Sequence, residues 1–300
     1  MKENSIDVDV LCVGHACYDL VFSVQKHPES DEKVFADDLV SSGGGPAANA
    51  AIAVSKLGLN AAFAGYLGND LYGEMHLQEF INHQVGTQLI ARGNAPTPLS
   101  TVLVKPDGKR ALVNYKGSTK ALLEGDIDFS TIKAKVILLD GHEPYISLKL
   151  VELARKLKIP TVLDAGSLHE GTEKLMDKVD YLVASEKFAC QVAGDVDSAL
   201  AVLATKSPAV VITLGEKGLI WQRGDQLGEM PAISISADIC DTTGAGDAFH
   251  GAFAAAIAKN MSWSDVLSYS SVAGTLCCTK VGARTGLPSK VEHNKVFLSL

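Results

Sequence analysis

Short runs of apolar and β-branched residues alternate along this chain with segments of helical periodicity. One such segment, residues 146–158, can place Leu148, Val151, Leu153 and Ala154 on one helical face. The apolar runs have the length of buried strands and occupy residues 8–13, 136–140, 161–164, 181–184 and 210–215. This alternation is typical of a mostly parallel sheet with helices on both faces. The sequence therefore predicts an α/β fold.

The early part of the chain shows a different pattern. Half-polar segments of the kind that form partly exposed strands occupy residues 19–40, 99–104 and 110–114. The last two are joined by KPDGKR, in which Asp107 and Gly108 favour a hairpin turn. We see no repeat and no linker. We expect one domain, residues 1–300, carrying a small β-sheet lid built from two segments, approximately residues 17–40 and 97–118.

Charge and cysteine content restrict the partners and the compartment. The 35 acidic and 27 basic residues give a net charge of −8, which argues against a general nucleic-acid or anionic-membrane surface. The six cysteines show no metal-binding spacing, as expected of free thiols in a reducing, cytoplasmic compartment. The chain start is too charged for a signal peptide, and no apolar run approaches the roughly 18 residues of a membrane span.

The segment DTTGAGDAFHG, residues 241–251, places glycines and an acid where an apolar helix begins. Unpaired N–H groups of Gly244, Ala245 and Gly246 would point from the positive end of this helix toward an anion. Asp247 is the nearest carboxylate. It is either a helix-start acid that stabilises the helix dipole or the base that phosphoryl transfer needs beside an anion site.

Two further glycine-rich segments precede helices or follow strands. SSGGGPAANAAIAVSKLG, residues 41–58, contains Pro46 at a predicted first helical turn and is either a tight loop or a ligand-binding loop. TLGEKG, residues 213–218, ends a predicted strand, where ligands of open α/β sheets collect. His142 and His250 are either bases or packed side chains. The chain contains neither a P-loop nor a GxGxxG fingerprint.

Four motifs occur in a characteristic order: SGGGPAANAAIAVSKLG, GYLGNDLYG, TLGEKG and DTTGAGDAFHG. Together with the order of strands and helices along nearly the whole chain, they resemble the ribokinase-like (PfkB) family of sugar kinases. The resemblance implies a Rossmann-like sheet with a β-sheet lid, ATP as phosphoryl donor with Mg²⁺, and transfer to a sugar hydroxyl. It also implies that Asp247 is the catalytic base and that Gly244, Ala245 and Gly246 form the anion hole.

The resemblance assigns further positions by motif. The sugar-binding positions are Asp19, Gly44, Gly45 and Asn49, and Glu143 is expected to face the sugar as well. The nucleotide positions are Thr213, Gly215 and Gly218, together with Gly244 and Gly246. The positions that hold a monovalent cation such as K⁺ in many relatives are Asp241 and Thr243, followed by loop atoms around Ala283 and Thr285.

One motif departs from the family pattern. Many relatives carry NxxE after the strand at residues 181–184, and the acid of that motif helps to organise magnesium through water. Here the sequence is SEKF, so Ser185 and Phe188 replace the usual Asn and Glu. Glu186 is the remaining acid and the candidate for this role. Magnesium bound mainly by ATP phosphates would not require the missing glutamate.

Within the family, softer matches resemble the sulfofructose kinase branch: GGGPAANAA, VNY, GAGDAFHGA, CTKVGARTGLP and FLSL. They imply a ketohexose-type substrate such as fructose or sulfofructose. An anionic end of that sugar would need local donors or positive charge. Lys33, Asn114 and Lys116 could reach it from a closed lid, and His142 from the main domain. The alternative is that both lysines are solvated lid side chains.

Other functions remain open on the sequence alone. Ribokinase or 2-keto-3-deoxygluconate kinase activity would use the same motifs. The missing NxxE also fits a non-catalytic sugar or nucleotide sensor on the same fold. A nicotinamide-dependent dehydrogenase lacks its glycine fingerprint here. Exposed lid strands have unpaired edges, from which we expect a homodimer that pairs through the lid.

Overall fold

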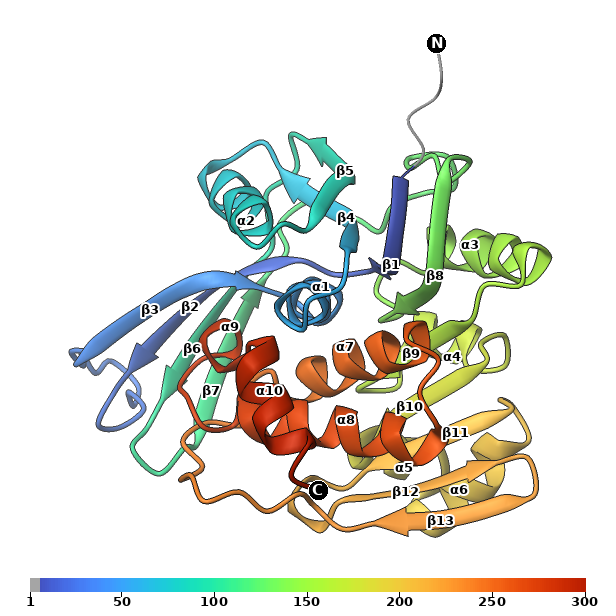
Figure 1. Ribbon diagram of the computed structural model, residues 1–300. Helices are drawn as coiled ribbons and strands as arrows, with labels where there is room; N and C mark the ends of the chain where they lie inside the picture. Colours follow the sequence, from blue (N-terminus) through green and yellow to red (C-terminus); the bar gives the residue numbers. More distant parts are fainter. Residues whose placement is uncertain (1–5) are drawn as a thin grey trace.

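The computed structural model describes residues 6–300 and contains a nine-stranded sheet in the order β13-β12-β11-β10-β9-β8-β1-β4-β5 (Figure 1). Strands β11 to β5 in this order are parallel, and β12 and β13 add an antiparallel edge. The predicted mostly parallel sheet is therefore confirmed. The strands are β1 Ile6–Val13, β4 Ala61–Gly68, β5 Gly86–Gly93, β8 Ile132–Leu139, β9 Thr161–Ala165, β10 Tyr181–Ser185, β11 Ala209–Thr213, β12 Leu219–Arg223 and β13 Gln226–Met230.

Helices cover both faces of this sheet, as predicted (Figure 1). One face carries α1 Pro46–Lys56, α2 Leu71–Asn82, α7 Ala245–Ala258, α8 Trp263–Cys277 and α10 Lys290–Phe297. The other carries α3 Pro144–Leu157, α4 Glu170–Leu175, α5 Glu186–Ala193 and α6 Val196–Ala204. Helices α1 and α7 pack very closely, because a Cβ on Gly251 would lie 2.7 Å from the Ala50 carbonyl oxygen.

The apolar run of β1 is explained by burial on both faces. Val10 and Cys12 belong to the core beneath α1 and α7, whereas Leu11 and Val13 belong to the core beneath α3. Successive side chains of a strand point to opposite faces, so a strand between two helical layers must be apolar throughout.

A second, four-stranded sheet has the order β3-β2-β6-β7 and projects to one side of the main sheet (Figure 1). Its strands are β2 Cys17–Ser23, β3 Asp38–Gly44, β6 Leu99–Val104 and β7 Arg110–Tyr115. They lie within or beside the two predicted lid segments. That this sheet moves as a lid on a single domain remains a prediction.

The structure corrects two expectations about the first lid segment. Residues 24–37 connect β2 to β3 and are not a strand, although the whole of residues 19–40 was expected to be extended. Residues 41–44 are the end of β3 and not a loop. The strand needs glycine here for lack of space: a Cβ on Gly43 would overlap the His76 ring, and one on Gly44 would overlap the Asp19 carboxylate. Glycine lets this strand lie against both side chains.

Across residues 6–300 we find no helix with the length and apolar character needed to cross a bilayer. The structure has free thiols at all six cysteine positions, namely Cys12, Cys17, Cys190, Cys240, Cys277 and Cys278.

Candidate active site

Asp247 lies in the first turn of α7, where the carboxyl ends of β9 and β10 approach the helix. Its Oδ2 accepts a hydrogen bond of 2.6 Å from the Asn49 side-chain amide of α1. Burial raises the pKa of Asp247 and the nearby Asp164 carboxylate adds to the rise, while the Asn49 hydrogen bond opposes it; the resulting pKa is about 7. A carboxylate with a pKa near neutrality is suited to accept a proton from a hydroxyl.

Gly244, Ala245 and Gly246, here called the glycine nest, lie at the start of α7 directly before Asp247. Gly244 is the N-cap with φ 79°, and a Cβ there would lie 2.6 Å from that of Ala283, so both conformation and space require glycine. Around Gly246 the position of a Cβ has no other heavy atom within 4 Å. The Ala245 N–H, which we expected to be open to an anion, instead donates to the Thr242 carbonyl at 3.3 Å. The first turn of a helix leaves other N–H groups without intrahelical partners.

The predicted sugar-binding residues come together where β2, β3 and α1 meet. Asp19 on β2 lies against Gly44 of β3. Gly45, with φ 98°, follows this strand and caps α1, and a Cβ there would overlap the His15 carbonyl. Asn49 is buried one turn later and links this group to Asp247. Burial raises the pKa of Asp19.

Glu143 is buried at the start of α3, where it accepts a hydrogen bond of 2.6 Å from the Leu122 N–H. Burial raises its pKa to about 7. With His15, His142 and Lys116 it lines a narrow cavity of about 20 Å³. The imidazole of His142 lies 5.3 Å from that of His15 between ring centroids. The structure therefore gathers polar and basic groups beside the predicted sugar position.

The lid candidates for sugar contacts are separated in the structure. Lys33 is exposed in the connection between β2 and β3, and Asn114 is exposed on β7 opposite Ser100. Lys116, directly after β7, reaches the cavity beside Glu143. Of these three residues, Lys116 is the one that the structure brings to a site residue.

The predicted nucleotide loop follows β11. The Thr213 hydroxyl donates to the Ala184 carbonyl at 3.3 Å, and the chain then turns through the 3-10 helix η1, Gly215–Lys217. Gly215 and Gly218 have φ values of 60° and 95°, and a Cβ on Gly218 would overlap the Met230 carbonyl. Glycine is needed at these turns, which lie at the carboxyl end of the sheet.

The altered NxxE segment has a clear structural role. Ser185 caps α5 by accepting a hydrogen bond of 3.0 Å from the Phe188 N–H, and Phe188 is fully buried in the core. Its aromatic ring therefore cannot supply the missing acid. Glu186, the first residue of α5, lies 3.6 Å from the ammonium group of Lys217 in the nucleotide loop. A carboxylate, the type of group that Mg²⁺ prefers, thus lies beside that loop, and its role with Mg²⁺ stays a prediction.

The residues assigned to a monovalent cation are already engaged. Asp241 Oδ1 accepts from the Thr243 N–H and hydroxyl at 2.9 and 2.7 Å, and Oδ2 accepts from Gly282 N–H at 2.9 Å. Burial opposes ionisation of Asp241, but the hydrogen bonds from Gly282 and Thr243 lower its pKa, and the Arg110 guanidinium from β7, which contacts the Thr243 hydroxyl, adds a smaller lowering effect. A monovalent cation at Asp241 and Thr243 stays a prediction.

Sequence reasoning missed several residues of this site. Asp164 is the second-to-last residue of β9, and burial and the neighbouring Asp140 raise its pKa to about 7. Asp140 follows β8 and accepts N–H hydrogen bonds from residues 15, 47 and 142. Both acids end predicted strands, so their position at the carboxyl edge was a usable signal. Arg110 and Arg284 gave no such signal, because only the folded chain brings them to the site.

His250 is a packed side chain. Its Nδ1 lies 2.6 Å from the Gly246 carbonyl oxygen and 3.3 Å from Asp164 Oδ2, and its Nε2 lies 3.1 Å from the Val183 carbonyl oxygen. Burial lowers its pKa. Of the two roles considered for it, the structure favours the structural one, in which His250 ties the start of α7 to β9 and β10.

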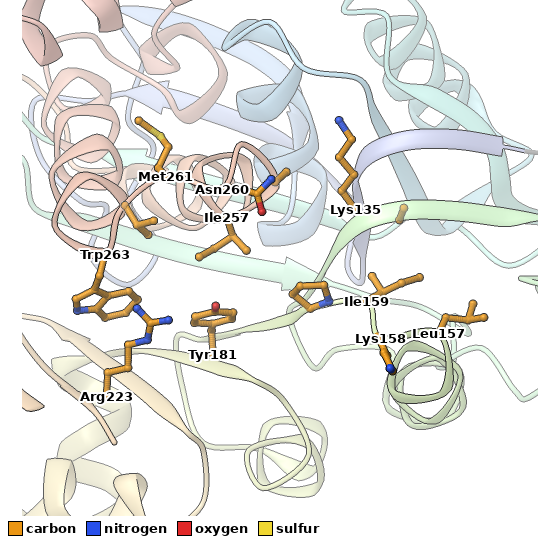
Figure 2. A pocket seen from close by; sticks show the side chains of 14 residues that line it. Lys135, Leu157, Lys158, Ile159, Tyr181, Arg223, Ile257, Asn260, Met261 and Trp263 are labelled. Carbon is orange, nitrogen blue, oxygen red and sulfur yellow. The ribbon is translucent and has the colours of Figure 1, made fainter. Parts of the chain in front are cut away.

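A larger cavity of about 710 Å³ lies at the amino ends of the strands, around Tyr181, Ile257 and Trp263 (Figure 2). Tyr181 begins β10, and Ile257 lies near the end of α7. At 1.5 Å per residue, Ile257 is about 15 Å along the helix from Asp247. This cavity is therefore separate from the acidic and glycine-rich site.

Comparison with solved structures identifies the fold as ribokinase-like. A protein from Agrobacterium tumefaciens, provisionally called a ribokinase, is 29% identical and superposes with a TM-score of 0.87 over 98% of both chains. Arabidopsis thaliana ribokinase, solved with ribose and ATP, is 23% identical, with a TM-score of 0.84 over 97% of this chain and 99% of that one.

The sequence comparisons give the family. The model of the pfkB family carbohydrate kinases matches residues 7–290. Ribokinase from Lactococcus lactis is 28% identical over 288 residues, covering 94% of this chain and 95% of that protein. Fructokinase-2 from Zea mays is 27% identical over 281 residues, covering 83% of each. The chain belongs to the pfkB family and is a carbohydrate kinase, a phosphotransferase with an alcohol group as acceptor.

Proposed function

We propose that this kinase transfers the γ-phosphate of ATP to a primary hydroxyl of a ketohexose-type sugar. The observation that carries the proposal is the placement of Asp247, with its raised pKa of about 7, directly after the glycine nest and against Asn49. In the reaction the sugar oxygen bonds to the γ-phosphorus, the bond to the leaving ADP breaks, and Asp247 accepts the hydroxyl proton. N–H groups at the start of α7 stabilise charge on the transferring group.

Two features support ATP as the donor. The glycine turn at residues 215–218 and the start of α7 are the kinds of backbone that bind phosphates. Arabidopsis ribokinase, of the same fold, binds ribose and ATP. The Arg110 guanidinium beside Thr243 adds a cation from the second sheet. Mg²⁺ held mainly by the ATP phosphates would neutralise their charge, and Glu186 would approach it through water.

For the sugar, we propose a ketohexose and include one with an anionic end, such as sulfofructose. Asp19 and Asn49 can bind sugar hydroxyls. Lys116 and His142 line a cavity with Glu143 and His15, and the His15 carbonyl lies against Gly45. A sulfonate or carboxylate placed there would receive donors that neutral fructose does not use. The named relatives of this chain include both ribokinases and fructokinases, so the substrate has to be measured.

The test compares kcat/KM for fructose, ribose, 2-keto-3-deoxygluconate and 6-deoxy-6-sulfofructose. We expect sulfofructose to be the best substrate and Lys116→Ala to lower its kcat/KM by about tenfold, the effect of one charge-assisted hydrogen bond. Lys33→Ala is the matched control, because Lys33 is an exposed lysine of the same sheet region.

Each other outcome has a definite meaning. Fructose as good as sulfofructose, or an equal effect of the two lysine variants, would contradict the anionic end. Ribose as the best substrate would make the enzyme a ribokinase. Absence of ADP release with every sugar would favour a sensor.

We expect the rate to depend on pH through Asp247. The deprotonated carboxylate is the active base, and its pKa is about 7. kcat should therefore be low below pH 6, rise through pH 7 and level off above it. The measurement is the pH profile of kcat at saturating ATP and sugar. A profile that is flat between pH 5.5 and 8 would assign the proton to another group.

Glu186 should tune the magnesium requirement without being essential. We expect Glu186→Gln to raise the Mg²⁺ concentration needed for half-maximal rate by several-fold, because a carboxylate that attracts the hydrated ion is lost. The measurement is a magnesium titration at fixed ATP, with Glu216→Gln, an acid of the nearby η1 turn, as control. An unchanged titration would leave Glu186 as a helix-start acid.

We also propose a homodimer formed through the second sheet. Apolar side chains are exposed on this sheet and its connection, namely Phe35, Leu39, Leu112, Val113 and Tyr115. Strands β3 and β7 are its edges, and edges with exposed apolar groups favour pairing. Light scattering at micromolar concentration should give twice the chain mass. Val113→Lys should abolish the dimer, whereas Val291→Lys, on exposed α10, should not.

We also propose that the protein is located in the cytoplasm, because its cysteines are free thiols.

A further inference from the structure

Arg284 is a buried arginine of α9, Ala283–Gly286, that makes contacts in three directions. Its Nε donates to Asn49 Oδ1 at 2.6 Å, and one terminal nitrogen lies 2.7 Å from His76 Nε2. The other lies 3.4 Å from Glu79 Oε2. Arginine cannot lose its proton inside a protein, so a buried guanidinium stays charged and needs acceptors around it.

The contact with Asn49 determines which way its amide points. A guanidinium is only a donor, so the side-chain atom that faces it must be the amide oxygen. The amide nitrogen therefore points to the other side, where Asp247 Oδ2 accepts from it at 2.6 Å. Arg284 thus fixes the orientation of the side chain that donates to the candidate base.

Arg284 is itself held in place by side chains of α2, the helix that lies beside the second sheet. Glu79 of α2 accepts the Gly43 N–H of β3 with both oxygens, at 2.9 and 3.0 Å, and its carboxylate faces the guanidinium. His76 has a pKa well below its usual value because of burial, so its Nε2 accepts from Arg284 as a neutral ring nitrogen. The chain of contacts runs from β3 to Asp247.

We propose that Arg284 is a positioning residue for phosphoryl transfer: it holds the Asn49 amide against Asp247 and keeps a permanent positive charge in the wall of the site. The inference rests on the proposed role of Asp247 as the base. Asp164 and His250 also flank Asp247, and Asp19 and Glu79 flank Arg284. Arg284 is the group among these that carries a fixed charge and a directed N–H toward Asn49.

The experiment compares Arg284→Gln and Arg284→Lys by steady-state kinetics between pH 5.5 and 9. We expect Arg284→Gln to lower kcat at pH 7 by about tenfold, and the acid limb of the pH profile to move to higher pH because the carboxylate has lost a nearby cation. Arg284→Lys keeps the charge but not the planar fork, so kcat should fall while the acid limb stays close to that of the parent. KM for ATP should not change.

Arg92→Gln is the matched control, since Arg92 also donates to carbonyls and pairs with a glutamate, Glu74, but does so on β5 away from Asp247. It should keep the parent pH profile. Folding is followed by circular dichroism and thermal unfolding. If neither Arg284 variant folds, Glu79→Gln decides, because it leaves Arg284 in place and removes the anion that holds it. A several-fold loss of kcat with parental KM for ATP is then expected.

Parental kcat and acid limb in a folded Arg284→Gln or Arg284→Lys, or parental kcat in Glu79→Gln where only that variant folds, would overturn the inference. Failure of the proposed function gives a different result. In that case Asp247→Asn would remain active, whereas failure of this inference alone leaves Asp247→Asn inactive and the Arg284 variants unaffected.

Discussion

Asp247→Asn is expected to lower kcat by about 10² or more while leaving the affinities for ATP and sugar close to those of the parent. Asparagine has the shape of aspartate and can still contact Asn49, but it cannot accept the hydroxyl proton at neutral pH. The loss should therefore appear in kcat and not in KM. The measurement is coupled ADP release at saturating concentrations of both substrates, at several pH values.

Asp265→Asn provides the control for the simpler role of Asp247 as a helix-start acid. Asp265 occupies the corresponding position in the first turn of α8 and is far from the glycine nest in sequence. If both aspartates only stabilise helix dipoles, the two variants should show similar small losses of stability and near-parental rates. An Asp247→Asn enzyme that turns over like the parent would require another base.

Gly246→Val should fold like the parent and lose most of its activity. The Cβ position at Gly246 has open space around it, so the side chain can be accommodated, but that space is where the transferring phosphate would approach the N–H groups of α7. Losing one such interaction typically costs about 10² in rate. We expect a loss of this size in kcat/KM for ATP, with the melting temperature changed little.

Gly244→Ala offers the opposite combination. Its positive φ and its closeness to Ala283 mean that a methyl group must strain the loop, so the melting temperature should fall. Comparing the two variants therefore distinguishes a glycine that the fold requires, Gly244, from one that an approaching phosphate requires, Gly246. A folded Gly246→Val enzyme with parental kinetics would refute the anion site.

The sequence predicted most of the main sheet because its central strands are apolar on both faces, as in β1. It did not predict β4, β5, β12 or β13: β4 is rich in alanine and glycine, and the others are half-polar strands at an edge of the sheet or next to one. The residues from Gly244 to Asp247 were predictable because one helix start positions them all. Arg284 and Asn49 are 235 residues apart, and no local pattern connects them.

Because α1 packs tightly against α7, we expect the two sides of the site to differ in how far they can move. Asn49 and Asp247 are carried by these two helices, which at Gly251 and Ala50 approach each other too closely to accommodate even a methyl group. Such close packing leaves the two helices little room to move against each other. We therefore expect any shape change during the reaction to occur in the second sheet, which carries Asp19 and Arg110. On this prediction the base stays at rest, and the substrate is brought to it.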